Sequence, residues 1–235
     1  MAPPAAEKLQ KSLRGKGLNG SRQPRPLAAS CEPHNGRGCP MKVEFWYEFA
    51  STYSYPAAMR AAREAGAAGV ELVWRPFLLG PIFGAQGWND SPFNIYPAKG
   101  RYMWRDMARI CEAEGLTLEK PAIFPQNGLR AARLAVLGTD EDWMPEFSRR
   151  VYLANFAEGK DISDRAVLSA ILTSLDLDAA SLVEAANEQA AKDKLRAQNE
   201  EAVAKGIFGA PSFIVGDELF WGNDRMEEAF AWAKR

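Results

Sequence analysis

The pattern of apolar and polar residues predicts a strand, a helix and a second strand at the start of the regular sequence. Residues 42–49 are β-branched and aromatic, which favours a buried strand. Residues 55–68 are rich in alanine and predict a helix, with Pro56 in its first turn. Residues 70–77 predict a second strand. A strand–helix–strand unit of this length indicates two parallel strands joined by a right-handed crossover.

A block of helical patterns separates this unit from a second β segment. Residues 78–97 are predicted to form a loop, because Gly, Pro and Asn are frequent there. Helical periodicity then dominates residues 98–205. Residues 207–221 contain two apolar runs joined by a Gly-Asp pair, which predicts a β-hairpin.

The chain ends in a predicted amphipathic helix over residues 225–234, with Asp224 and Glu227 placed as a capping-box-like pair. The order βαβ, helices, ββα predicts an α/β fold of the thioredoxin-like type, with helices inserted between its two halves. The predicted parts are a thioredoxin-like domain over 41–77 and 206–235, and an inserted region over 78–205 made of a connecting loop and a helical domain.

The charge balance differs between the first forty residues and the rest of the 235-residue chain. Residues 1–40 hold seven Lys or Arg and two acidic residues, without apolar periodicity, and we expect a disordered basic extension ahead of Met41. The remainder holds 22 basic and 28 acidic side chains. Such a mildly acidic surface predicts no binding to nucleic acid or to an anionic membrane.

Cysteine and histidine are almost confined to the first forty residues. Cys31, His34 and Cys39 lie there without a fourth zinc ligand, so no metal site is predicted. The rest of the chain has only Cys111, at a core-facing helical position, and no histidine. This excludes Ser-His-Asp and Cys-His catalysis in that part. Without internal disulfides or an apolar export signal, we expect a cytoplasmic protein.

The candidate chemistry begins at Ser51-x-x-Ser54, where a thioredoxin-like domain would carry Cys-x-x-Cys. Hydroxyl groups cannot exchange disulfides, so a thiol would have to come from a ligand. Ser54 is predicted to cap the helix. The second landmark is Pro211, which we predict to be cis, with the backbone of Ala210 pairing an extended ligand. A proline at a strand start is also common without any such role.

Five segments resemble, in order, the 2-hydroxychromene-2-carboxylate isomerases, which are DsbA-like relatives of kappa-class glutathione transferases. The segments are 49–55, 75–80, 99–103, 206–211 and 221–225, and the resemblance extends from Met41 to the C-terminus. It implies glutathione as the cofactor and a small aromatic substrate. It also implies a homodimer, since such relatives are commonly dimers.

The resemblance further implies which residues hold glutathione. They are Ser51 as the catalytic serine whose hydroxyl donates to the sulfur, Asn89 and Lys99 as contacts to the tripeptide, Ala210 through its main chain, and Gly222, Asn223 and Asp224 at the γ-glutamyl end. A charge-assisted bond from Ser51 of roughly 1.5 to 3 kcal/mol, with the helix dipole, can lower a thiol pKa by about one to two units. Ser51 and Asp224 could alternatively serve only as helix caps.

Three functions fit these residues. The first is a glutathione-dependent cis-trans isomerase that forms a trans-benzylidenepyruvate by reversible thiolate addition. The second is a kappa-like transferase or peroxidase, and the third is a non-catalytic module that binds glutathione or a peptide. Phe83, Trp88 and Trp104 are candidates for the aromatic substrate pocket, with ordinary core packing as the alternative.

Overall fold

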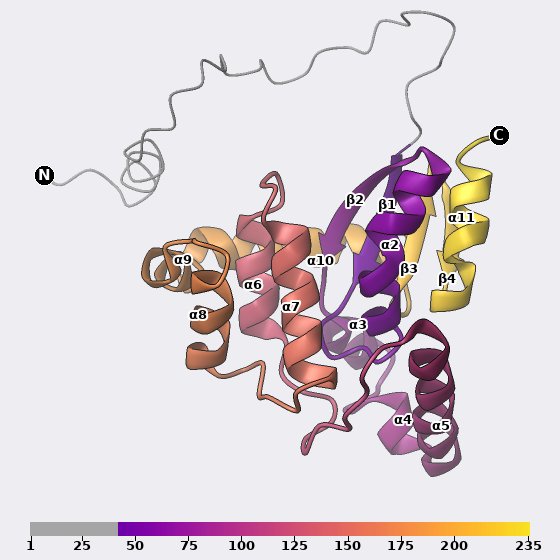
Figure 1. Ribbon diagram of the computed structural model, residues 1–235, viewed down its shortest axis with the longest axis horizontal. Coiled ribbons are helices and arrows are strands. Elements are labelled where there is room, and N and C mark those ends of the chain that lie inside the picture. The colour runs from indigo at the N-terminus through magenta and orange to yellow at the C-terminus, as the bar shows by residue number, and fades with distance from the viewer. Residues whose placement is uncertain (1–41) are drawn as a thin grey trace, which may run out of the picture. The chain divides into compact units, whose positions relative to one another are not determined.

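A four-stranded mixed sheet organises residues 42–235, the part of the chain that the computed structural model describes (Figure 1). The strands lie in the order β2 (Glu71–Pro76), β1 (Lys42–Tyr47), β3 (Ser212–Val215) and β4 (Glu218–Trp221). β1 pairs in parallel with β2, while the β1–β3 and β3–β4 pairs are antiparallel. This confirms the predicted βαβ unit and hairpin. The predictions for residues 1–40 lie outside the described residues.

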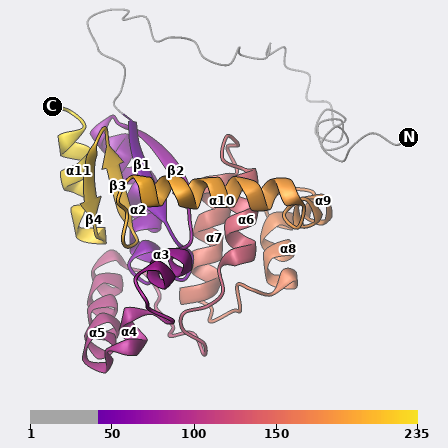
Figure 2. The same ribbon diagram turned by 180° about the vertical axis from the view of Figure 1, so that it is seen from behind.

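Helices cover both faces of the sheet. On one face lie α2 (Ser54–Ala68) and α11 (Met226–Trp232), and on the other lie α3 (Leu79–Ala85) and the end of α10 (Gln189–Ala204) (Figures 1 and 2). Side chains alternate between the faces along a strand. Phe45 and Tyr47 therefore pack in the main core beneath α2, while Trp46 packs against α3 and α10.

Six further helices lie between the two halves of the sheet sequence. They are α4 (Pro92–Ile95), α5 (Pro97–Glu114), α6 (Leu129–Leu137), α7 (Met144–Phe156), α8 (Arg165–Thr173) and α9 (Ala179–Ala185). α7 packs against α2, and its Tyr152 hydroxyl donates to the Glu48 carbonyl at 2.9 Å. The helical region is thus anchored to the chain just after β1. The fold is the predicted thioredoxin-like fold of the DsbA type with inserted helices.

Two local predictions were wrong. Residues 78–97 are not all loop: burial of Ile82 holds the glycine-containing α3 in place, and the Ser91 hydroxyl caps α4. The last helix starts later than predicted, because a 3-10 turn, η1 (Asn223–Arg225), precedes it. Asp224 therefore forms no capping box, and Glu227 forms an ion pair with Arg60 instead.

Cys111 lies on the buried face of α5 together with Met103 and Met107, and only 1% of its surface is exposed. Burial raises the pKa of its thiol to about 11. The prediction that Cys111 is a core residue is confirmed. Within residues 42–235, no helix combines the length and the apolar character that a bilayer crossing needs.

Candidate functional site

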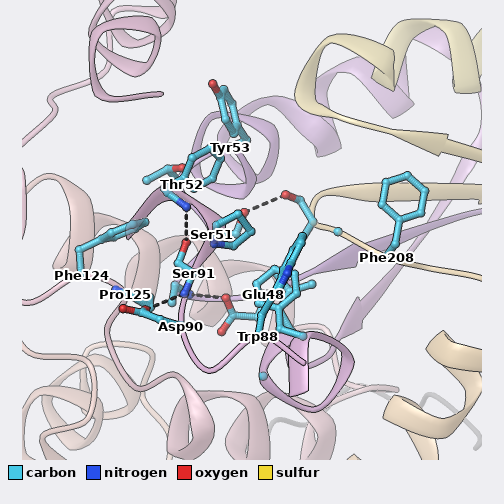
Figure 3. Close-up of a pocket in the computed structure, with 18 of the residues that line it drawn as sticks. Glu48, Ser51, Thr52, Tyr53, Trp88, Asp90, Ser91, Phe124, Pro125 and Phe208 are labelled. Carbon is cyan, nitrogen blue, oxygen red and sulfur yellow. Dashed lines mark hydrogen bonds between the residues drawn. The ribbon is translucent and has the colours of Figure 1, made fainter. Parts of the chain in front are cut away.

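A cleft of about 1480 Å³ opens where β1 ends and α2 begins (Figure 3). Its walls come from residues 48–53 between β1 and α2, the region of α3 to α5, and segments near residues 124–129, 208–210 and 221–225. Most of the lining is apolar. All seven residues predicted for the site line this cleft: Ser51, Asn89, Lys99, Ala210, Gly222, Asn223 and Asp224. The fold thus brings together positions from both halves of the sequence.

Ser51 lies at the head of α2 and makes two hydrogen bonds. Its hydroxyl donates to the Ala210 carbonyl at 2.9 Å (Figure 3). It also accepts from the Ser54 N–H at 3.3 Å. The Ser51 hydroxyl, rather than that of Ser54, therefore accepts from the first backbone N–H of α2. Ser54 is the first residue of α2 and its hydroxyl makes no capping hydrogen bond, so its predicted role as the cap was wrong.

The Ala210–Pro211 peptide bond is cis, as predicted. The Gly222 N–H donates to the Pro211 carbonyl at 2.9 Å, which places the chain after β4 beside this bond. Among the described residues, none accepts a hydrogen bond from the Ala210 N–H. This N–H is a donor on the cleft wall that a ligand can use.

At the other end of the cleft, Arg60 of α2 holds Asn223. The guanidinium donates to both the side-chain oxygen and the carbonyl of Asn223, which is only 9% exposed, and it also pairs with Glu227. Asp224 is different, because its side chain is 74% exposed and its nearest cation is Arg225, at 3.6 Å. Sequence reasoning missed Arg60. Its signal was a single arginine among the alanines on the buried face of the helix.

Lys99 and Asn89 are both exposed on the cleft wall. The Lys99 ammonium lies 4.8 Å from the centre of the Tyr96 ring, at the start of α5. Neither side chain forms an ion pair or hydrogen bond with another described residue. Both are placed to contact a ligand.

Aromatic side chains account for much of the apolar lining. Phe83 and Trp88 line the cleft, as the sequence suggested, with ring centres 5.5 Å apart. Trp104 is not part of the lining and packs edge-on against Phe124 at 5.0 Å. The other aromatic residues on the cleft were not among the predicted pocket residues: Tyr53, Phe93, Tyr102, Phe124, Phe208 and Trp221.

Glu48 is a further residue that the sequence-based site missed. It follows β1 directly, lines the cleft and is only 7% exposed. Its Oε2 accepts the Ala50 N–H at 3.0 Å (Figure 3). Burial raises the pKa of its carboxyl to about 7, against the opposing effect of the backbone N–H groups of Ala50 and Ser51. The available signal was an acidic residue between an apolar strand and Ser51.

Comparisons with known proteins agree on the kind of protein that this chain resembles. The profile of the family described as DSBA-like thioredoxin domain matches residues 42–230. A 2-hydroxychromene-2-carboxylate isomerase of Sphingobium xenophagum is 29% identical over 187 residues, which cover 79% of this chain and 94% of that protein. The glutathione S-transferase kappa 2 of Caenorhabditis elegans is 24% identical, over 79% of this chain and 88% of that protein.

A solved structure is also similar. The structure of a 2-hydroxychromene-2-carboxylate isomerase superposes with a TM-score of 0.75 and 25% identity, covering 83% of this chain and 95% of that one. The names of these relatives are those of enzymes, which supports an enzymatic role for the chain.

Proposed function

Since the chain belongs to the DSBA-like thioredoxin domain family, we propose that it is a glutathione-dependent isomerase. Its substrate would be 2-hydroxychromene-2-carboxylate or a similar aromatic-degradation intermediate, and its product a trans-benzylidenepyruvate. The observation that carries this proposal is Ser51, a hydroxyl at the head of α2 in a largely apolar cleft. The names of the relatives support the choice of reaction.

The polar groups of the cleft fit the charges of glutathione, which has two carboxylates and one ammonium. Lys99 offers a cation and Asp224 an exposed carboxylate, so each can meet a terminal group of opposite charge. The Ala210 N–H would donate to the peptide backbone between them. The Thr52 hydroxyl, which also lines the cleft, has no hydrogen-bond partner among the described residues.

Ser51 would turn its hydroxyl from the Ala210 carbonyl toward the cysteinyl sulfur of the tripeptide. A hydrogen bond to a charged acceptor contributes roughly 1.5 to 3 kcal/mol, and the N-terminus of the 15-residue α2 adds roughly 0.3 to 1 kcal/mol. Together these favour thiolate at neutral pH without a histidine base. When bound, glutathione would supply the nucleophilic sulfur that adds reversibly to the conjugated double bond of the substrate.

The apolar lining would hold a planar aromatic substrate beside Ser51. Phe83 and Trp88 from the α3 region and Phe208 and Trp221 from the β3–β4 region present rings to the same cleft. Aromatic walls with a few polar groups are typical of small-molecule sites. The kappa-class relative supports a second candidate, a transferase or peroxidase that uses the same cleft.

The test compares turnover of 2-hydroxychromene-2-carboxylate with and without glutathione. We expect Ser51→Ala to lower kcat/KM by about 10- to 100-fold, the equivalent of one charge-assisted hydrogen bond, with a smaller loss of glutathione affinity. Ser54→Ala is the matched control, because it removes a hydroxyl of the same turn that does not line the cleft. Turnover that is absent from the wild type, or is indifferent to glutathione, would rule out the isomerase.

A further inference from the structure

The cleft contains one buried carboxyl that the mechanism above does not use, that of Glu48. It stands three residues before Ser51, and both side chains line the same cleft (Figure 3). The Ser51 N–H donates to the Glu48 carbonyl at 3.0 Å, while the Ala50 N–H donates to Oε2. A single turn of backbone therefore fixes the carboxyl next to the serine.

The second oxygen of Glu48 is not engaged by any side chain. Within residues 42–235, Glu48 forms no ion pair. The other charged residues that line the cleft are Asp90, Lys99, Asp106, Asp224 and Arg225. Gly128 lies close to Oε1, because a Cβ atom added to Gly128 would be 3.1 Å from this oxygen. No cation of the described chain neutralises the buried carboxylate, so a proton is its available partner.

The surroundings of Glu48 contribute little charge of their own. From α7, Tyr152 faces it, and burial raises the pKa of that phenol well above its ordinary value, so the group stays neutral. From the segment before α6, Gln126, Asn127 and Gly128 have no ionisable group. Glu48 itself, with a pKa of about 7, exchanges its proton near neutrality. An ordinary glutamate would be too weak a base to keep a proton taken from a thiol.

We propose that the Glu48 carboxylate accepts the thiol proton of glutathione bound at Ser51, a role that rests on the proposed function. The S–H bond breaks and its electron pair stays on sulfur, while a lone pair of Oε1 forms the new O–H bond. No other reactant is needed. Ser51 cannot take this role, because its hydroxyl donates its own hydrogen bond to the sulfur. Glu48 returns the proton when glutathione leaves.

The experiment follows protons and thiolate when glutathione binds to the full-length protein. Calorimetry in two buffers of different ionisation enthalpy, at a pH of about 7.5, gives the number of protons released. Ultraviolet difference spectra give the fraction of thiolate. For the wild type we expect clearly less than one proton released for each thiolate formed, because a neighbouring thiolate favours the protonated form of Glu48. Glu48→Gln keeps the acceptor for the Ala50 N–H but cannot hold the proton, and Glu48→Asp keeps the acid.

For Glu48→Gln we expect release of about one proton for each thiolate formed, and a lower pH midpoint for thiolate formation, because no carboxylate charge then opposes the thiolate. Glu48→Asp should restore part of the wild-type behaviour, which a merely structural role would not predict. Equal proton release and an equal midpoint in the wild type and Glu48→Gln would overturn the proposal. If the wild type itself binds glutathione without forming thiolate, the proposed function fails, and the role of Glu48 falls with it.

A second measurement needs only the native protein. Infrared difference spectra should show a new carboxylic-acid band when glutathione binds, and no such band with S-methylglutathione, which has no thiol proton. If the band is absent with glutathione although thiolate forms, the proton has gone elsewhere and the proposal is wrong. This result does not depend on the folding of any variant.

Discussion

Ser51 combines two roles that sequence reasoning treated as alternatives. Its oxygen accepts from the Ser54 N–H, so it does contact the end of α2, and its hydrogen points to Ala210 within the cleft. A hydroxyl can accept and donate at once, so capping does not exclude a role toward a ligand. In the proposed function, Ser51 would donate to bound sulfur from the same position at which it accepts from the first N–H of α2.

A prediction at the same scale concerns Cys111. Because its thiol is buried and its pKa is raised to about 11, we expect it to be at least about 100-fold slower than a free thiol toward a disulfide reagent. The measurement uses a chain with Cys31 and Cys39 replaced by serine. Adding Ser51→Cys to that chain gives an accessible thiol as the control. Rapid reaction of Cys111 in the folded protein would contradict its place in the core.

At the scale of elements, α2 and the chain before α11 are held together by Arg60. Arg60→Met would leave two oxygen atoms of the buried Asn223 without their donor, so we expect the free energy of unfolding to fall by roughly 2 to 3 kcal/mol. The exposed Glu227 adds little to this value. Urea denaturation of Arg60→Met and of the control Arg63→Met, on the exposed face of α2, checks it. Equal stability of the two variants would contradict it.

A second element-scale prediction concerns the packing of α5 against α4. A methyl group on Gly100 would collide with the Phe93 carbonyl oxygen, so Gly100→Ala should destabilise the protein by about 1 to 3 kcal/mol. It should also weaken glutathione binding, because Lys99 is the adjacent residue. Gly66→Ala, at an open position of α2, should instead stabilise by up to about 1 kcal/mol. Thermal unfolding of both variants provides the comparison.

At the scale of the whole molecule, Glu48 links stability to pH. The folded pKa is about 7, above the ordinary value of 4.5, so the folded state retains a proton that the unfolded chain loses. The resulting stabilisation is complete below about pH 4.5 and is lost as pH rises through about 7. We expect Glu48→Gln to gain stability relative to the wild type over this range, by at most about 3 kcal/mol. A difference that does not change with pH would contradict the raised pKa.

The sequence by itself determined the elements and the identity of the chemical groups. Periodicity and turn residues predicted the strands and α2. Ser51 could be placed at the junction between the first strand and α2 because the Ser-x-x-Ser motif is a short, continuous stretch of sequence. Tertiary structure decided what those groups touch. Ser51 meets Ala210 across 159 positions, and Arg60 meets Asn223 across 163. It also decided that Glu48 is buried with no cation from residues 42–235 paired to it, and that Trp104 lies outside the cleft. Burial and desolvation arise from packing between distant segments, and no local pattern contains them.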